Sequence, residues 1–171
     1  GSVGPTNKTL SMSPDVNNPA FRSLTFDKLS DAYKEQMVAL IDGGVDALLI
    51  ETIFDTLNAK AAVYAAHEAM KQSGREVPIM ISVTVSDIAG RTLSGQTLEA
   101  FMASMQHVNI FSIGLNCSFG AKQLKPFLET LSNKSSYYIS AHPNAGLPNS
   151  LGQYDQTPEE MAEQVAEYVD E

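Results

Sequence analysis

The feature that most constrains the fold of this chain is a repeat in which an apolar, strand-like run is followed by polar residues and then by a helical pattern. Consecutive runs are separated by segments long enough to cross back over a sheet, so the repeat predicts parallel strands. The carboxyl ends of parallel strands open on one face, where active sites form. The five runs end at Pro5-Thr6-Asn7, Glu51-Thr52, Thr84-Val85-Ser86-Asp87, Asn116-Cys117 and His142-Pro143-Asn144. The predicted fold class is therefore α/β with about five β/α units, too few to close an eight-stranded barrel.

Capping residues and helix breakers indicate where the predicted helices begin and end. The second helix should run from about Thr56 to Ser73, with Asp55 capping its start and Gly74 ending it. The helix after the fourth strand should be shorter than those before it, because Pro126 must lie in its first turn or kink it. The last helix should open at Thr157-Pro158-Glu159-Glu160, a capping box with proline at the first helical position.

Length and composition indicate one globular domain covering residues 1–171. The net charge of −9 argues against nucleic acid and against an anionic membrane surface as partners. No apolar run reaches the roughly 18 residues that a membrane span needs. The single cysteine excludes an internal disulfide framework and fits a reducing compartment, so we expect the cytoplasm. The chain opens on a strand and stops just after a helix, so we expect it to be an internal part of a longer protein.

Cys117, at the end of the fourth run, has three interpretations from its sequence context. It could be a small buried hydrophobe, which is the commonest fate of a free cysteine. It could be a nucleophile, for which His142 at the next strand end is the only plausible base. It could be a zinc ligand, but the chain has no second cysteine, so a closed zinc site within it is improbable.

Glu51 and Asn144 are the other candidate site residues. The Glu51 carboxylate at the end of a buried strand could bind a substrate ammonium group, or it could cap a helix or form a loop salt bridge. Asn144 lies between proline and Ala145-Gly146, where asparagine commonly shapes a turn. The residues alone leave these alternatives open.

At these residues the chain resembles the homocysteine-binding domain of cobalamin-dependent methionine synthases. The matching segments run in the family's order over nearly the whole chain. They are GSVGPTNKTLSMSPDVNNPAFRSLTFDKL, GGVDALLIETIFDTLNAKAA, ISVTVSDIAGRTLSGQT, SIGLNCSFGAKQLKP and SAHPNAGLPNSLGQYDQTPEEMA. Within the second and the last of these, the stretches ETIFDTLNAKAA and PNAGLPN resemble the cobalamin enzymes rather than relatives that use betaine or methylmethionine.

The resemblance implies a partial TIM (β/α)8 barrel that holds strands three to seven of the family barrel. It implies that Cys117, in the motif GLNC, is one zinc ligand, that Glu51 binds the substrate, and that Asn144 is a substrate-binding asparagine beside the zinc. A Gly-Gly-Cys-Cys segment that supplies the family's other two zinc ligands does not occur in this sequence. His142 stands where the family pattern leads us to expect an aromatic residue.

The implied reaction is the transfer of a methyl group from methylcobalamin to a zinc-activated homocysteine thiolate, giving methionine. Homocysteine would be the substrate, and cobalamin and methyltetrahydrofolate would be carried by other modules of the same parent protein. We expect this chain alone to be inactive, to bind zinc weakly or not at all, and to form a homodimer through its open sheet. The alternatives are a half-barrel interaction module without catalysis and a Cys117/His142 nucleophilic enzyme.

Overall fold

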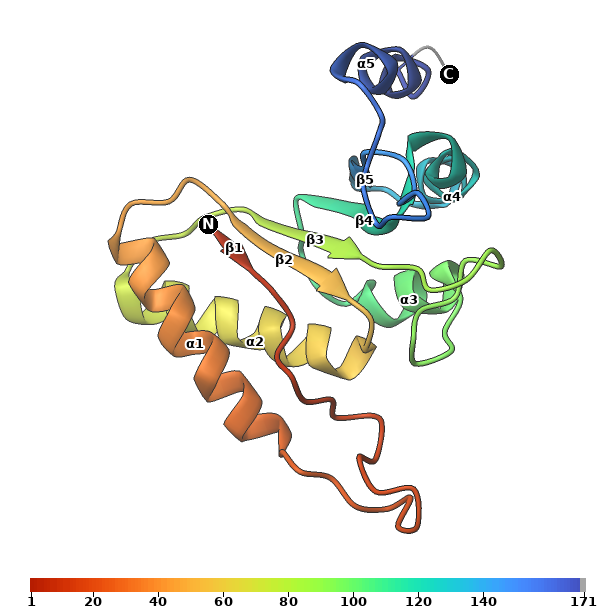
Figure 1. Cartoon of the computed structure of the whole chain (residues 1–171). Helices are drawn as coiled ribbons and strands as arrows, with labels where there is room; N and C mark the ends of the chain where they lie inside the picture. Colours follow the sequence, from red (N-terminus) through yellow and green to blue (C-terminus); the bar gives the residue numbers. More distant parts are fainter. Residues whose placement is uncertain (170–171) are drawn as a thin grey trace.

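A computed structural model describes residues 1–169 as strands that alternate with helices (Figure 1). The strands form one five-stranded sheet in the order β1-β2-β3-β4-β5, and every neighbouring pair is parallel. Their bounds are β1 Ser2–Val3, β2 Leu48–Ile53, β3 Ile79–Val83, β4 Ser112–Gly120 and β5 Tyr138–Asn144. The predicted parallel β/α repeat is confirmed, and the sheet is open rather than closed into a barrel.

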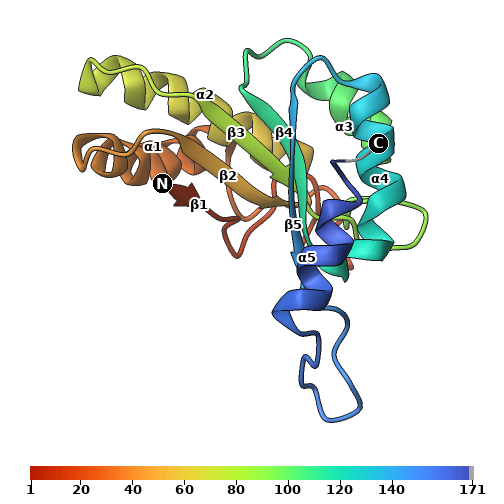
Figure 2. The same cartoon turned by 90° about the horizontal axis from the view of Figure 1, so that it is seen from above.

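The helices follow the strands that the sequence pattern assigned to them. They are α1 Phe26–Asp42, α2 Thr56–Ser73, α3 Leu98–Met105, α4 Ala121–Lys134 and α5 Pro158–Ala166. Figure 2 shows α1 and α2 side by side at the β1–β3 end of the sheet, with α4 beside β4 and β5. Among the described residues, no helix is long and apolar enough to cross a membrane.

The strand register separates the sheet into an apolar face and a face that is polar toward the carboxyl ends of the strands. In-register residues on neighbouring parallel strands point to the same side of a sheet. The row under the helices is Val3, Ile50, Ile81, Ile113 and Ile139, all of which belong to or pack against the core. The opposite face carries the row Leu49, Met80, Ser112 and Tyr138 near the amino ends of the strands, and then the row Ser82, Gly114 and Ser140, with Asn116 paired to His142 beyond it. The core therefore lies between sheet and helices, and the polar groups of the opposite face gather toward the carboxyl ends of the strands.

The predicted helix caps are confirmed. Asp55 caps α2 by accepting hydrogen bonds from the amides of Leu57 and Asn58, and Gly74 ends that helix in the left-handed conformation with φ of 64°. The side chain of Thr157 and that of Glu160 form the predicted capping box of α5.

Helix α4 is shorter than α1 and α2, but Pro126 does not lie in its first turn, which was one of the two positions predicted for it. Helix α4 is 14 residues long, and Pro126 lies inside it, beyond the first turn. The buried side chains of Leu124, Leu128 and Leu131 hold the helix against the sheet on both sides of the proline. Proline has no amide proton to donate to the carbonyl four residues earlier, which belongs to Lys122, an exposed residue.

Candidate functional site

The carboxyl ends of β2 and β4 carry the most unusual backbone of the described chain. Thr52, Cys117 and Ser118 have positive φ angles of 58°, 62° and 64°. These are the positive-φ residues other than glycine within residues 1–169. The strand register is interrupted at both places, between Ile50 and Ile53 and between Asn116 and Gly120. Irregularities of this kind re-aim side chains and are frequent beside active sites.

Asn116 joins three strand ends through a fully hydrogen-bonded side-chain amide. Its Oδ1 accepts from the Thr52 backbone amide at 3.0 Å and from the Ser82 hydroxyl at 2.7 Å. Its Nδ2 donates to Thr52 Oγ1 at 2.8 Å and to Cys117 Sγ at 3.1 Å. Only 3% of Asn116 is exposed, so these partners replace water completely.

Cys117 is exposed, which excludes its interpretation as a buried hydrophobe. Its sulfur accepts a hydrogen bond from Asn116. His142 lies on the next strand, in register with Asn116, and is exposed. Within residues 1–169 no hydrogen bond joins Cys117 to His142, so the geometry gives the nucleophile interpretation no base in place.

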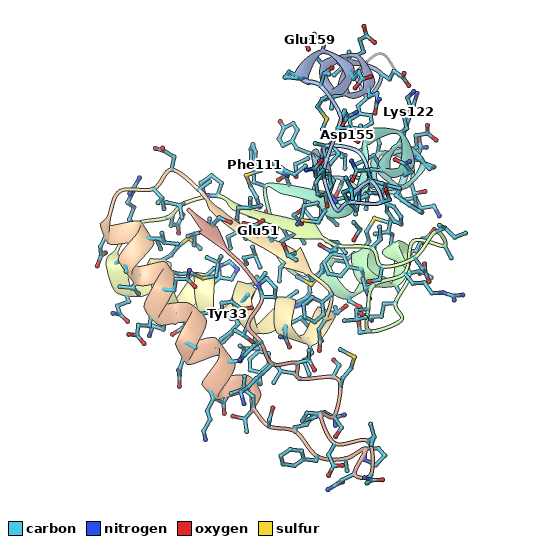
Figure 3. The ribbon with its side chains drawn as sticks, in the orientation of Figure 1. Tyr33, Glu51, Phe111, Lys122, Asp155 and Glu159 are labelled. Carbon is cyan, nitrogen blue, oxygen red and sulfur yellow. The ribbon has the colours of Figure 1, made fainter. Side chains whose placement is uncertain are left out.

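Glu51 lies on β2, immediately before the left-handed Thr52 (Figure 3). Its Oε1 accepts a hydrogen bond from the hydroxyl of Ser2 on β1. The side chain is partly exposed. Glu51 therefore neither caps a helix nor forms a salt bridge among the described residues, which were the two alternatives to a substrate contact.

Asn144 is the last residue of β5 and lies in register with Gly120 of β4. Its carbonyl accepts from the amide of Gly146 at 2.8 Å, which closes the turn expected for this sequence. The side chain makes no hydrogen bond within the described part of the chain, and it is partly buried. Its role at the substrate side of the site stays a prediction.

The described residues do not provide a complete metal site. No group of three or more histidine, cysteine, aspartate or glutamate side chains within residues 1–169 is arranged to hold a metal ion. Catalytic zinc sites use three protein ligands. Cys117 offers one exposed sulfur, so the residues present do not by themselves fit zinc.

A cavity of about 10 Å³ lies beneath Glu51 and is lined by Pro5, Tyr33, Asp55 and Asn58 among others. This volume holds at most about one water molecule, so it is not a substrate pocket. Burial raises the pKa of Tyr33, and the charge of Asp55 also raises it. A hydrogen bond with the backbone of Thr6 acts in the opposite direction and lowers it.

The sequence predicted Glu51, Cys117 and Asn144 as site residues, but it did not reveal the central place of Asn116 or the part of Ser2. The signal for Asn116 was an amide side chain at the end of an apolar strand, directly before the cysteine. Ser2 offered no signal, because its partner is 49 positions away in the sequence.

Comparison with known proteins bears on the family and the fold of the chain. The family model for homocysteine S-methyltransferase matches residues 1–171. The fold is similar to the crystal structure of the homocysteine methyltransferase MmuM from Escherichia coli in its metallated form, with a TM-score of 0.54 and 21% sequence identity. That match covers 68% of this chain and 40% of the other, so the chain spans less than half of the Escherichia coli protein. An open five-stranded sheet that matches part of this protein is consistent with a partial TIM barrel. The chain belongs to the homocysteine S-methyltransferase family.

Proposed function

We propose that this chain is part of the homocysteine-binding domain of a cobalamin-dependent methionine synthase. The observation that carries the proposal is that Glu51 and Cys117 flank one hydrogen-bonded unit, in which Asn116 contacts both Thr52 and Cys117 Sγ. A carboxylate suited to an ammonium group and an exposed sulfur thus lie at the carboxyl ends of β2 and β4, which β3 separates. Homocysteine carries an ammonium group and a thiol separated by a short chain.

In this proposal each residue has a separate task. The Glu51 carboxylate binds the substrate ammonium group by a charge-assisted hydrogen bond, while Ser2 fixes the orientation of that carboxylate. Asn144, at the end of β5, offers an amide to the substrate side of the site. Cys117 marks where the substrate sulfur is directed.

Zinc, when bound, would supply deprotonation of the substrate thiol, whose ordinary pKa of about 8.5 leaves it mostly protonated at neutral pH. Cys117 would be one of its ligands, and the remaining donors would come from outside the described residues. We therefore expect protein purified without added zinc to hold well under one zinc per chain. We also expect no methyl transfer from methylcobalamin to homocysteine by the chain alone. Near-stoichiometric zinc or measurable transfer would contradict this view of the donor set.

The partners in this proposal are modules of a longer parent protein, one carrying methylcobalamin and one binding methyltetrahydrofolate. The proposed compartment is the cytoplasm. The mostly apolar helix-facing side and polar strand ends favour a substrate site over a surface used only for protein contacts.

The test is a homocysteine titration of the isotopically labelled chain, followed by amide chemical shifts. Saturable shifts are expected around Glu51 and Cys117. Glu51→Gln keeps the shape of the side chain but removes its charge, and should weaken binding by about tenfold or more. Glu35→Gln, at an exposed position on α1, is the matched control and should bind as the unmodified chain does. Absence of saturable binding, or equal binding by both variants, would favour the non-catalytic interaction module.

A further inference from the structure

The side-chain amide of Asn116 is hydrogen-bonded to two residues that have an unusual backbone conformation. Its hydrogen bonds end on Thr52 and Cys117, two of the described residues with left-handed backbone. A positive φ is a genuine outlier for a β-branched residue such as Thr52. Such conformations persist only where the surrounding contacts over-determine them.

The two distorted residues are those next to, or identical with, the proposed substrate contacts. Thr52 follows Glu51, and its φ of 58° accompanies the register break that separates Ile50 from Ile53. Cys117 itself has a φ of 62° and begins the break in β4. The direction in which each functional side chain points therefore depends on backbone that Asn116 holds.

Asn116 uses its two ends differently. The Oδ1 atom accepts from the Thr52 amide and the Ser82 hydroxyl, while the Nδ2 atom donates to Thr52 Oγ1 and Cys117 Sγ. Its backbone carbonyl also accepts from the Thr84 hydroxyl at 3.2 Å. Because aspartate has no Nδ2 donor, Asn116→Asp removes the two donated bonds and keeps the acceptor side.

We propose that Asn116 is a positioning residue that holds the strand ends of β2 and β4 in their left-handed conformations, and thereby sets the spacing of Glu51 and Cys117 for one amino-thiol substrate. The inference rests on the proposed function for the identity of that substrate. The backbone effect is independent of the proposed function, because it is a property of the chain without ligand.

The first measurement uses the unmodified chain in solution. A left-handed residue gives a strong cross-peak between its amide and α protons, and this is expected at both Thr52 and Cys117. The side-chain amide protons of Asn116 should exchange slowly with solvent, since both are donated to protein atoms. Extended backbone at both residues, with rapid exchange of the Asn116 amide, would overturn the proposal without any variant.

The second measurement compares variants. Asn116→Ala and Asn116→Asp should both lose the strong cross-peak between amide and α protons at Thr52 or Cys117. If Asn116→Ala fails to fold, the Asn116→Asp variant alone tests the positioning role. Ser82→Ala is the matched control, because it removes one bond to the same amide, and within residues 1–169 Ser82 forms no hydrogen bond with Thr52 or Cys117. It should keep both signatures. Variants of Asn116 that keep them would overturn the proposal.

Homocysteine binding then links the backbone to the site. Asn116→Asp should weaken homocysteine binding by about tenfold or more, whereas Ser82→Ala should leave it within about twofold. Thr52→Gly in the Asn116→Ala background should restore part of the lost affinity, because glycine adopts positive φ without strain. If the unmodified chain binds no homocysteine, the proposed function fails while the backbone measurements still decide the role of Asn116. If binding is normal in Asn116→Asp, the positioning role fails and the proposed function stands.

Discussion

The carboxylate of Asp55 binds Ser11 through both of its oxygens: Oδ2 accepts from the Ser11 amide at 2.9 Å, and Oδ1 accepts from the Ser11 hydroxyl at 2.7 Å. The same carboxylate caps α2, and it is 1% exposed. Next to it, Asn58 accepts from the Leu10 amide and donates to the Lys8 carbonyl, each at 2.9 Å. The start of α2 thus anchors the long segment between β1 and α1, which extends away from the sheet (Figure 1).

Asp55→Ala should lower the free energy of unfolding by about 2–4 kcal/mol, because it removes a helix cap and leaves the Ser11 groups unpaired. Urea denaturation measures this change. Asp31→Ala, at an exposed position of α1, is the control and should change stability by less than about 0.5 kcal/mol. Equal effects of the two substitutions would show that the anchor does not stabilise the fold.

Gly114→Ala should prevent β4 and β5 from pairing as they do. A Cβ atom at Gly114 would lie 2.1 Å from the backbone oxygen of Ser140, which cannot rotate away. We expect a loss of about 3 kcal/mol or more in the free energy of unfolding. At Gly4 an added Cβ would meet nothing within 4 Å, so Gly4→Ala should be nearly neutral. A Gly114→Ala variant as stable as Gly4→Ala would contradict the β4–β5 register.

The buried Tyr33 predicts a stability loss in alkaline solution. Burial raises its pKa in the folded state, and the Asp55 charge raises it further. The unfolded chain therefore loses this proton first, so the stabilisation is complete below the ordinary tyrosine pKa of about 10 and disappears as the pH rises through the folded value. Tyr33→Phe should flatten the fall of stability above about pH 10, measured by urea denaturation at a series of pH values. Equal slopes for the two proteins would contradict this.

The open edge of β5 predicts self-association. Tyr138 on this strand is 71% exposed and its ring lies 5.0 Å from that of Phe111. We expect the association to involve the strand edge and this aromatic pair, because unpaired strand edges and exposed apolar side chains favour pairing with another chain. Sedimentation equilibrium at micromolar concentration should detect a dimer, which Tyr138→Lys should weaken and Tyr154→Lys, in an exposed loop, should not. A monomer at all concentrations would contradict the prediction.

Much of the fold could be predicted from the sequence because it depends on local signals. Apolar runs, glycine stops and the caps at Asp55 and Thr157 act over a few residues. The position of Pro126 within α4 was not predicted, because the sequence pattern shows only the local cost of a proline in a helix. Packing of the buried leucines on both sides of Pro126 maintains α4. The partner of Asp55 at Ser11 and that of Asn116 at Thr52 could not be predicted, since those contacts join residues 44 and 64 positions apart.

The most direct test of the central claim is thiol–disulfide exchange at Cys117, the only cysteine in the chain. Attack of its thiolate on homocystine forms a mixed disulfide and releases one homocysteine thiolate. Hydroxyethyl disulfide, which lacks the ammonium group, reports the intrinsic reactivity of the same thiol. If Glu51 binds the ammonium group while the sulfur meets Cys117, the ratio of the two rates should fall by about tenfold in Glu51→Gln and stay unchanged in Glu35→Gln. A ratio that Glu51→Gln leaves unchanged would contradict a shared homocysteine site.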